Sequence, residues 1–159
     1  MGQIVSLIFC IAREGISMKK ILVAVDGSNY SQNALLKAKE IASAIGSEVT
    51  ILNVVNYLKD NALYMNNREL KAELAKTALK QSDDVLKSAK EIFKDFPGTV
   101  FTSYRTGDAV DEIIKFAEEG KFDLVIMGSR GAGIFSRTLL GSVSDKVVHH
   151  VKTSVLIVK

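Results

Sequence analysis

The segment DLVIMGSRGAGIFSRTLLGSVSDKVV, residues 123–148, decides the fold class of this chain. Its apolar start belongs to the run FDLVIM at residues 122–127, the most uniformly apolar strand pattern in the sequence, which we place centrally in a sheet. Gly128 ends this run, two more glycines follow within five residues, and a helical pattern then extends from about Val143 to His150. A buried strand that leads through a loop into a helix is the repeating unit of parallel α/β proteins.

The same alternation of strand and helix extends outward from this segment in both directions. Strand patterns lie at residues 19–28, 47–55 and 99–107 before it and at residues 154–159 after it. Apolar residues at helical spacing connect them over residues 28–46, Arg68–Phe96 and 109–120. Five strands that alternate with four helices predict parallel pairing through right-handed crossovers. We therefore expect an α/β fold, a doubly wound five-stranded parallel sheet with helices on both faces.

Local signals mark the ends of these elements. Gly46, Gly120 and the pair Pro97-Gly98 follow helical patterns, where glycine and proline are typical stop residues. Asp108 precedes the third helix and is the predicted N-cap residue. The strand pattern at residues 99–107 alternates in polarity, which indicates an edge position.

The composition indicates one globular domain without a nucleic-acid partner. The chain has 159 residues, of which 47% are hydrophobic, and this is enough to build a full core. Its 21 basic and 18 acidic residues are mixed along the sequence and give a net charge of only +3, without the basic stripe that binds phosphate backbones. The single cysteine, Cys10, cannot form an internal disulfide, so we predict a cytoplasmic protein.

The first 17 residues stand outside the α/β pattern. We interpret residues 1–17 as an N-terminal extension, or as the product of a start called upstream of Met18, and residues 18–159 as the domain. Two alternatives stay open for residues 1–17: an added element packed on the domain, and a membrane role. We expect no membrane contact, because the apolar run Ile4–Ala12 is far shorter than the roughly 20 residues needed to cross a bilayer.

Residues suited to ligand binding follow the first and the fourth predicted strands. In doubly wound sheets, ligands bind beyond the carboxyl ends of the strands, where the strand order reverses. Asp26-Gly27-Ser28 follows the first strand, and Gly128-Ser129-Arg130-Gly131 follows the fourth. If these two strands are neighbours, the crevice for a ligand lies between the two turns.

The loop and helix start after the fourth strand have the chemistry of a phosphate site. Gly128, Gly131 and Gly141 have no Cβ, so the main chain there could turn tightly and approach a ligand closely. The first turn of the last helix would present unpaired N–H groups and the positive end of the helix dipole. Hydroxyl donors and mobile positive charge would come from four further residues, Ser142, Ser144, Arg130 and Arg137.

A purely structural interpretation of these residues stays open. Ser142 and Asp145 have the spacing of a capping box, with Asp in place of the usual Glu, and glycines after a strand are common turn residues. A dinucleotide site is disfavoured, because GAGIFS at residues 131–136 lacks the third glycine and Val54-Val55-Asn56 offers no acid for a ribose. His149 and His150 would point about 100° apart on a helix, so we interpret them as surface or partner-contact residues rather than metal ligands.

These motifs together resemble the universal stress protein family. Gly128-x-x-Gly131, nine residues and then Gly141-Ser142 match the nucleotide motif of that family. ILVAVDGS, GDAVDEII, DLVIMGSRG and LLGSVSDKVV are similar to its other signature blocks, and the resemblance covers residues 18–159. Two positions depart from the usual pattern: Ser154 stands where proline often begins the last strand, and AGIF at residues 132–135 replaces a more common glycine-containing loop.

The resemblance implies a strand order of 3-2-1-4-5, ATP held across the first and fourth strands, and homodimers paired through the last strand at Val155–Val158. The positions implied around adenine and ribose are Ala24, Val25, Asp26 and Val54. Those implied along the ribose and phosphates are Met127, Gly128, Ser129, Arg130, Gly131, Ala132 and Gly133. The phosphate tail would be held by Gly141, Ser142, Val143 and Ser144.

From these observations we expect an ATP-binding protein of the cytosolic stress response that acts through nucleotide-dependent interactions. No positioned general base accompanies the phosphate loop, so any ATP hydrolysis should be slow. A magnesium or manganese ion would be held mainly by the phosphates and water. Asp26 is interpreted as a ribose or adenine contact, or as support for the Gly27-Ser28 turn, before catalysis. The alternatives are an enzyme that uses ATP for nucleotidyl or phosphoryl transfer, and a nucleotide-free dimeric scaffold.

Overall fold

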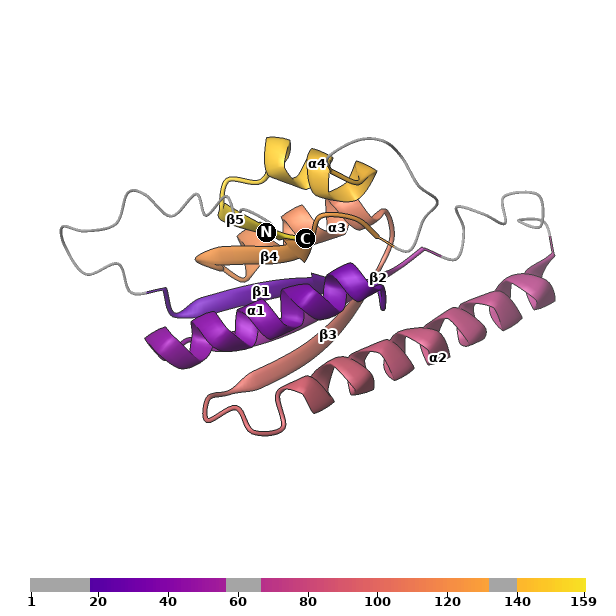
Figure 1. Ribbon diagram of the computed structural model, residues 1–159. Helices are drawn as coiled ribbons and strands as arrows, with labels where there is room; N and C mark the ends of the chain where they lie inside the picture. The colour runs from indigo at the N-terminus through magenta and orange to yellow at the C-terminus, as the bar shows by residue number, and fades with distance from the viewer. Residues whose placement is uncertain (1–17, 57–66, 132–139) are drawn as a thin grey trace.

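The structure, a computed structural model, describes residues 18–56, 67–131 and 140–159, which fold into a parallel sheet between two layers of helices (Figure 1). The strands are β1 (Lys20–Val25), β2 (Glu48–Val55), β3 (Val100–Thr106), β4 (Leu124–Gly128) and β5 (Ser154–Val158). Every pair of neighbouring strands is parallel, and their order is β3-β2-β1-β4-β5. The predicted doubly wound sheet and its order are confirmed. The first and fourth strands are therefore neighbours.

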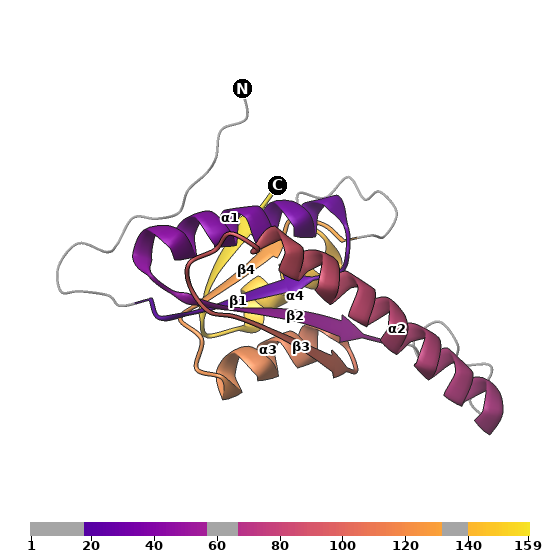
Figure 2. The same ribbon diagram turned by 90° about the horizontal axis from the view of Figure 1, so that it is seen from below.

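The four helices are α1 (Asn29–Ile45), α2 (Arg68–Ile92), α3 (Ala109–Glu119) and α4 (Ser142–His150). α1 and α2 share one apolar core with the sheet, and α3 and α4 share another core on the opposite face. In Figures 1 and 2, the amino-terminal part of α2 extends beyond the end of the sheet. No helix among the described residues is long and apolar enough to cross a membrane.

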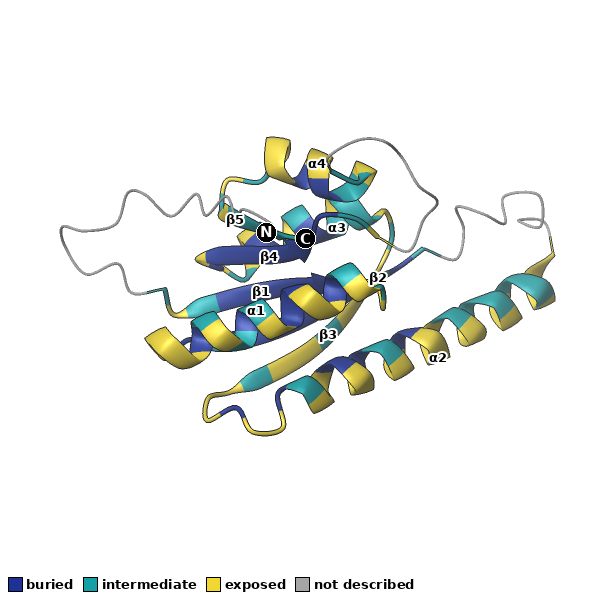
Figure 3. Ribbon diagram, in the orientation of Figure 1, coloured by how far each residue is buried: buried dark blue, intermediate teal, exposed yellow. Residues whose placement is uncertain are grey.

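Burial follows the strand order, as Figure 3 shows. All five residues of β4 are buried, so its predicted interior position is confirmed. β3 lies at one edge, as its alternation predicts, and most of its residues are exposed. β5 lies at the other edge with four of its five residues half-buried.

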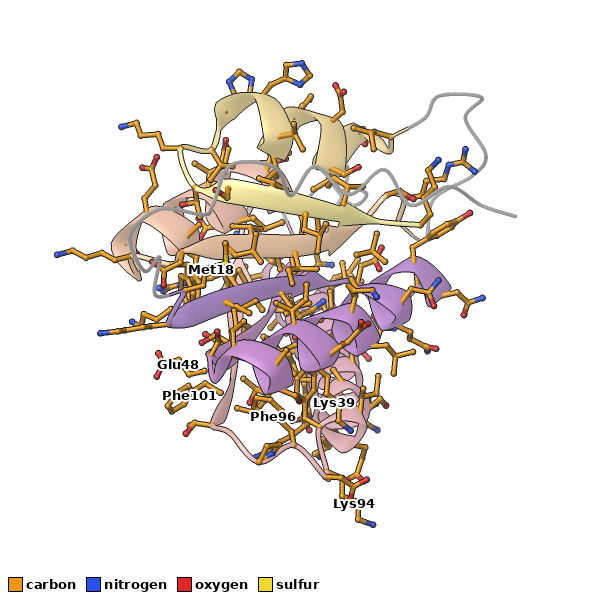
Figure 4. All side chains as sticks on the ribbon, turned by 60° about the vertical axis from the view of Figure 1, so that its left-hand side comes forward. Met18, Lys39, Glu48, Lys94, Phe96 and Phe101 are labelled. Atoms are coloured by element: carbon orange, nitrogen blue, oxygen red, sulfur yellow. The ribbon has the colours of Figure 1, made fainter. Side chains whose placement is uncertain are left out.

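Polar side chains make hydrogen bonds at the amino ends of the strands. In Figure 4 this end of the sheet lies near the labels of Met18, Glu48 and Phe101. Asp123 Oδ2 accepts hydrogen bonds from the main-chain N–H groups of Lys19 at 2.8 Å and Lys20 at 2.9 Å. Lys20 Nζ in turn donates to the carbonyl oxygen of Gly120 at 3.1 Å. Hydrogen bonds of Asp123 and Lys20 with the main chain thus stabilise the amino end of the sheet.

The predicted caps are confirmed where the structure describes them. Gly46 ends α1 in the left-handed conformation, with φ of 74°, and its N–H donates to the carbonyl oxygen of Ala42. Asp108 Oδ1 accepts hydrogen bonds from the N–H groups of Val110 at 2.9 Å and Asp111 at 3.4 Å at the start of α3. Gly120 ends α3.

Two helix boundaries differ from the predictions. α2 ends at Ile92 rather than at Phe96. Phe96 precedes Pro97, which disfavours a helical conformation, and it lies in a turn with its ring edge-on to Phe93 at 5.5 Å between centroids. α4 begins at Ser142, one residue before the predicted start. The predicted extension at residues 1–17 lies outside the described residues.

Candidate functional site

The candidate site lies where β1 and β4 end side by side. Ala24 pairs with Met127 at the last position of this parallel ladder, and Asp26 and Ser129 follow within two residues. This is the point where the strand order reverses, with β2 on one side of β1 and β5 beyond β4. A crevice in this position is where doubly wound sheets bind their ligands.

The predicted adenine and ribose contacts lie on both faces of the sheet, because successive side chains of a strand point to opposite faces. Ala24 and Met127 are buried in the core beneath α3 and α4, with half-buried Val54 packed against them. They form an apolar floor of the kind that would hold a flat ring. Val25 belongs to the opposite core, beneath α1 and α2, so its side chain lies on the other face of the sheet from Ala24 and Met127. The family resemblance implied Val25 together with Ala24, Asp26 and Val54, and a position in a motif does not say on which face of a strand the side chain lies.

Asp26 braces the turn after β1. Its Oδ1 accepts hydrogen bonds from the N–H of Ser28 at 3.0 Å and from the hydroxyl of Ser28 at 2.6 Å. Between these two residues Gly27 has φ of 81°, a left-handed conformation that favours glycine. Ser28 then caps α1 by accepting from the N–H of Ser31 at 3.2 Å. Support of this turn is one of the roles that the sequence suggested for Asp26.

The motif glycines are needed for close approach rather than for left-handed backbone. A Cβ on Gly131 would lie 2.6 Å from Asp26 Oδ2, and a Cβ on Gly141 would lie 3.2 Å from the Cα of Arg130. These two glycines bring together the end of β1, the loop after β4 and the start of α4. A Cβ on Gly128 would lie 2.8 Å from the carbonyl carbon of Tyr30, so the missing side chain of Gly128 serves packing on α1.

The start of α4 has no side-chain cap. Gly141 is the N-cap residue, with φ of −72° and ψ of 161°, and Ser142 is the first helical residue. The capping-box interpretation of Ser142 is therefore wrong. Asp145 is the first residue whose N–H bonds back within the helix, to the carbonyl oxygen of Gly141 at 2.9 Å. The N–H groups of residues 142–144 have no intrahelical partner and are available at the positive end of the helix dipole.

The two serines of this turn differ. Ser142 is exposed, whereas only 3% of Ser144 is exposed. The Ser144 hydroxyl lies 3.0 Å from the carbonyl oxygen of Ser129 and 3.0 Å from that of Gly141. Of the two hydroxyl donors that the sequence suggested, only that of Ser142 faces outward.

The remaining predicted residues are distributed around this turn. Arg130 is half-buried, Gly131 is exposed, and Val143 is half-buried against the core beneath α3 and α4. Ala132, Gly133 and Arg137 lie outside the described residues. His149 and His150 are exposed at the far end of α4, where His149 Nδ1 lies 2.7 Å from the carbonyl oxygen of Asp145. The described residues contain no cluster of three metal-ligating side chains.

Three contacts at the site were missed by sequence reasoning. Tyr30 lies against Gly128, and the carbonyl oxygen of Ser129 accepts from both Gly141 N–H, at 2.7 Å, and the Ser144 hydroxyl. None of the three has a local sequence signal, because each joins residues at least ten positions apart.

A separate cleft of about 240 Å³ lies between α1 and α2. It is lined by Val25, Gly27, Ser31, Gln32, Leu35, Asp84, Val85, Ser88, Ala89 and Ile92. None of these residues belongs to the start of α4, and the cleft opens on the opposite face of the sheet from Ala24 and Met127. It is therefore distinct from the candidate site at the ends of β1 and β4.

Comparison with known proteins connects this geometry to one family. The sequence model of the universal stress protein family matches residues 18–159. A universal stress protein of Methanocaldococcus jannaschii is 34% identical over 142 residues, which cover 89% of this chain and 82% of that relative.

Solved structures have the same architecture. The universal stress protein UspA from Lactobacillus plantarum superposes with a TM-score of 0.80 at 22% identity, covering 91% of this chain and 100% of that one. At that identity the likeness shows the fold alone. A universal stress protein solved in complex with cAMP has a TM-score of 0.69 at 27% identity, and the match covers 90% of this chain and 98% of that protein.

Proposed function

The chain belongs to the universal stress protein family, and from this premise we propose that it binds ATP across β1 and β4 and acts through nucleotide-dependent interactions rather than through turnover. The complex of a similar family member with cAMP supports a nucleotide as the class of ligand. Cytoplasmic location and a role in a stress response are part of this proposal.

One observation carries the proposal: two glycines of the nucleotide motif lie where a Cβ would press on Asp26 or on the main chain of Arg130. A Cβ on Gly131 would meet Asp26, and a Cβ on Gly141 would meet the main chain of Arg130. Gly131 thus lies close to the residue after β1, and Gly141 lies close to the residue two positions after β4, so main-chain atoms from the end of β1, the end of β4 and the start of α4 gather on one surface. Main-chain N–H groups on such a surface bind phosphate oxygens well.

The proposed pose follows from the chemistry along this surface. Adenine and ribose would lie over the apolar floor of Ala24, Val54 and Met127, near Asp26. The phosphates would reach the N–H groups of residues 142–144 and the Ser142 hydroxyl, with Arg130 nearby. Several donors at the far end of the surface favour a polyphosphate over a cyclic monophosphate. A magnesium or manganese ion would be bound through the phosphates and water.

The hydrogen bonds of Asp26 support binding of ATP without rapid hydrolysis. One carboxylate oxygen already accepts two hydrogen bonds from Ser28, and the other lies against Gly131. A carboxylate that supports a turn in this way is poorly placed to take a proton from an attacking water. We therefore propose that the bound nucleotide changes what the protein contacts.

The test is calorimetric titration of the purified protein with ATP, ADP, AMP and cAMP in the presence of magnesium, together with identification of any nucleotide that co-purifies. We expect ATP to bind most tightly and phosphate release to stay far below the typical enzymatic range of roughly 1 per second and above. Steady turnover in that range would favour the ATP-using enzyme. Absence of binding by all four nucleotides would favour the nucleotide-free scaffold.

Homodimerisation through β5 is a further part of the proposal. β5 pairs with β4 on one side, and Val155–Val158 are half-buried at the edge of the sheet. An apolar edge strand is a template for pairing with a second copy. Light scattering at micromolar concentration should give the mass of a dimer, and Ile157→Pro, which removes a main-chain N–H, should lower it. A monomer for the unmodified protein would contradict this part.

A further inference from the structure

Ser144 is buried within an exposed helix turn. Its exposed fraction is 3%, although Ser142 before it and Asp145 after it are both exposed. The Ser144 hydroxyl lies 3.0 Å from each of two carbonyl oxygens, those of Ser129 and Gly141. A serine hydroxyl has a single hydrogen, so these two acceptors share it and none is left to donate to a ligand.

The Ser129 carbonyl is the point where these contacts meet. It accepts from the N–H of Gly141 at 2.7 Å as well as from the Ser144 hydroxyl. Ser129 is itself 2% exposed, and its N–H donates to the carbonyl oxygen of Val158 at 2.7 Å. The start of α4 is thus fixed to the end of β4 and, through the same residue, to the end of β5.

Resting on the nucleotide site proposed above, we infer that Ser144 is a positioning residue for the phosphates. It contacts the protein rather than the ligand, and it orients the N–H groups of residues 142–144 by holding the first turn of α4 on Ser129. Gly141 cannot do this with a side chain, because a Cβ there would lie 3.2 Å from the Cα of Arg130. The Ser144 hydroxyl therefore fixes the first turn of α4 by donating to carbonyl oxygens, and it leaves the N–H groups of the turn without a side-chain acceptor.

The structure supplies a matched control at Ser82. Ser82 is also a helical serine with an exposed fraction of 3%, but its hydroxyl has no hydrogen-bond partner among the described residues. It lies on α2, away from the start of α4. Ser82→Ala and Ser144→Ala remove the same group at the same burial, and only the second breaks hydrogen bonds that fix the phosphate turn.

The experiment measures the ATP dissociation constant of the full chain and of three variants, Ser144→Ala, Ser144→Thr and Ser82→Ala, with ligand-free melting as a check on folding. Loss of the shared hydrogen bond in Ser144→Ala should weaken ATP binding by about tenfold. Ser144→Thr keeps the hydroxyl and should stay within about threefold of the parent, and Ser82→Ala should bind as the parent does. Amide hydrogen exchange of Gly141 and Asp145, whose N–H groups are hydrogen-bonded at the start of α4, should be faster in ligand-free Ser144→Ala only.

Each result decides the inference. A folded Ser144→Ala that binds ATP as the parent does would overturn it, as would a folded Ser144→Thr that binds no better than Ser144→Ala. Equal weakening by Ser82→Ala would assign the effect to general loosening of the fold and would also overturn it. Failure of the parent to bind any nucleotide would overturn the proposed function itself, and with it this role of Ser144.

Discussion

The starts of α3 and α4 have similar places in the fold but opposite chemistry. Each helix follows a strand, begins at the carboxyl end of the sheet and packs on the same face. Asp108 closes the start of α3 by accepting hydrogen bonds from two main-chain N–H groups. Gly141 precedes α4 and has no side chain to do so. At the start of α3 a side chain accepts from two main-chain N–H groups, whereas the N–H groups at the start of α4 have no side-chain cap.

The same distinction holds for the other two helices. Ser28 caps α1, and Asn67 caps α2 by accepting from the N–H of Leu70 at 3.1 Å. Among the four described helices, α4 is the one whose N-cap residue makes no side-chain hydrogen bond. Capping stabilises a helix by typically about 1 kcal/mol. At α4, the buried hydroxyl of Ser144 holds the first turn by donating to the carbonyl oxygens of Ser129 and Gly141. The solvent-facing side of this turn is not covered by a capping side chain.

The largest expected effect tests whether the end of β4 is held by packing on α1. In Gly128→Ala, the new Cβ would lie 2.8 Å from the carbonyl carbon of Tyr30, a main-chain atom, so the backbone of one of the two elements must shift. Overpacking of this kind should lower the free energy of unfolding by about 3 kcal/mol. Denaturant unfolding measures this, and Gly46→Ala is the control because its Cβ would meet nothing within 4 Å. Gly46 has positive φ, so that variant should lose only about 1 kcal/mol. Equal losses would contradict the packing role of Gly128.

The second prediction tests whether the uncapped start of α4 binds phosphate. Ser142→Asp places a carboxylate at the positive end of the helix, which should leave the ligand-free melting temperature unchanged or slightly raised. The same carboxylate would occupy the anion site and repel phosphate oxygens. At about 4 Å and an effective dielectric of 20, two charges interact by roughly 4 kcal/mol before screening, so ATP binding should weaken by about a hundredfold. Calorimetric titration measures the loss. Undiminished ATP affinity in Ser142→Asp would remove the phosphate site from α4.

The smallest expected effect tests whether the cap at the start of α3 serves stability alone. Asp108→Ala removes the side chain that accepts from Val110 and Asp111, so the free energy of unfolding should fall by about 1 kcal/mol. For a domain of this size that lowers the melting temperature by roughly 4 °C. ATP affinity should not change, and Asp108→Asn should restore most of the stability, because Asn is a comparable N-cap. Lower ATP affinity in Asp108→Ala would mean that the start of α3 is also part of the nucleotide site.

The sequence by itself determined the order of the elements and the covering of both sheet faces by helices, and it predicted where the candidate site lies. These follow from periodicity and from the position of the glycines relative to strand ends, both of which are local properties of the chain. Family resemblance gave the strand order, and the structure confirms it. The predicted end of α2 was wrong because Phe93 and Phe96 continue the apolar spacing of the helix, although α2 ends at Ile92, before the residue that Pro97 keeps out of a helical conformation.

Only the tertiary structure decided what each site residue contacts. Gly128 meets Tyr30 across nearly a hundred residues of sequence, Ser144 donates to Ser129 at a sequence separation of 15, and the side chain of Val25 faces the core opposite to Ala24. The spacing of Ser142 and Asp145 fits a capping box equally well, yet Gly141 is the N-cap. The spacing of residues along the sequence determines only which of them lie in the same turn of a helix or in the same loop. The partners of a hydroxyl or of a missing Cβ depend on which elements the sheet brings together.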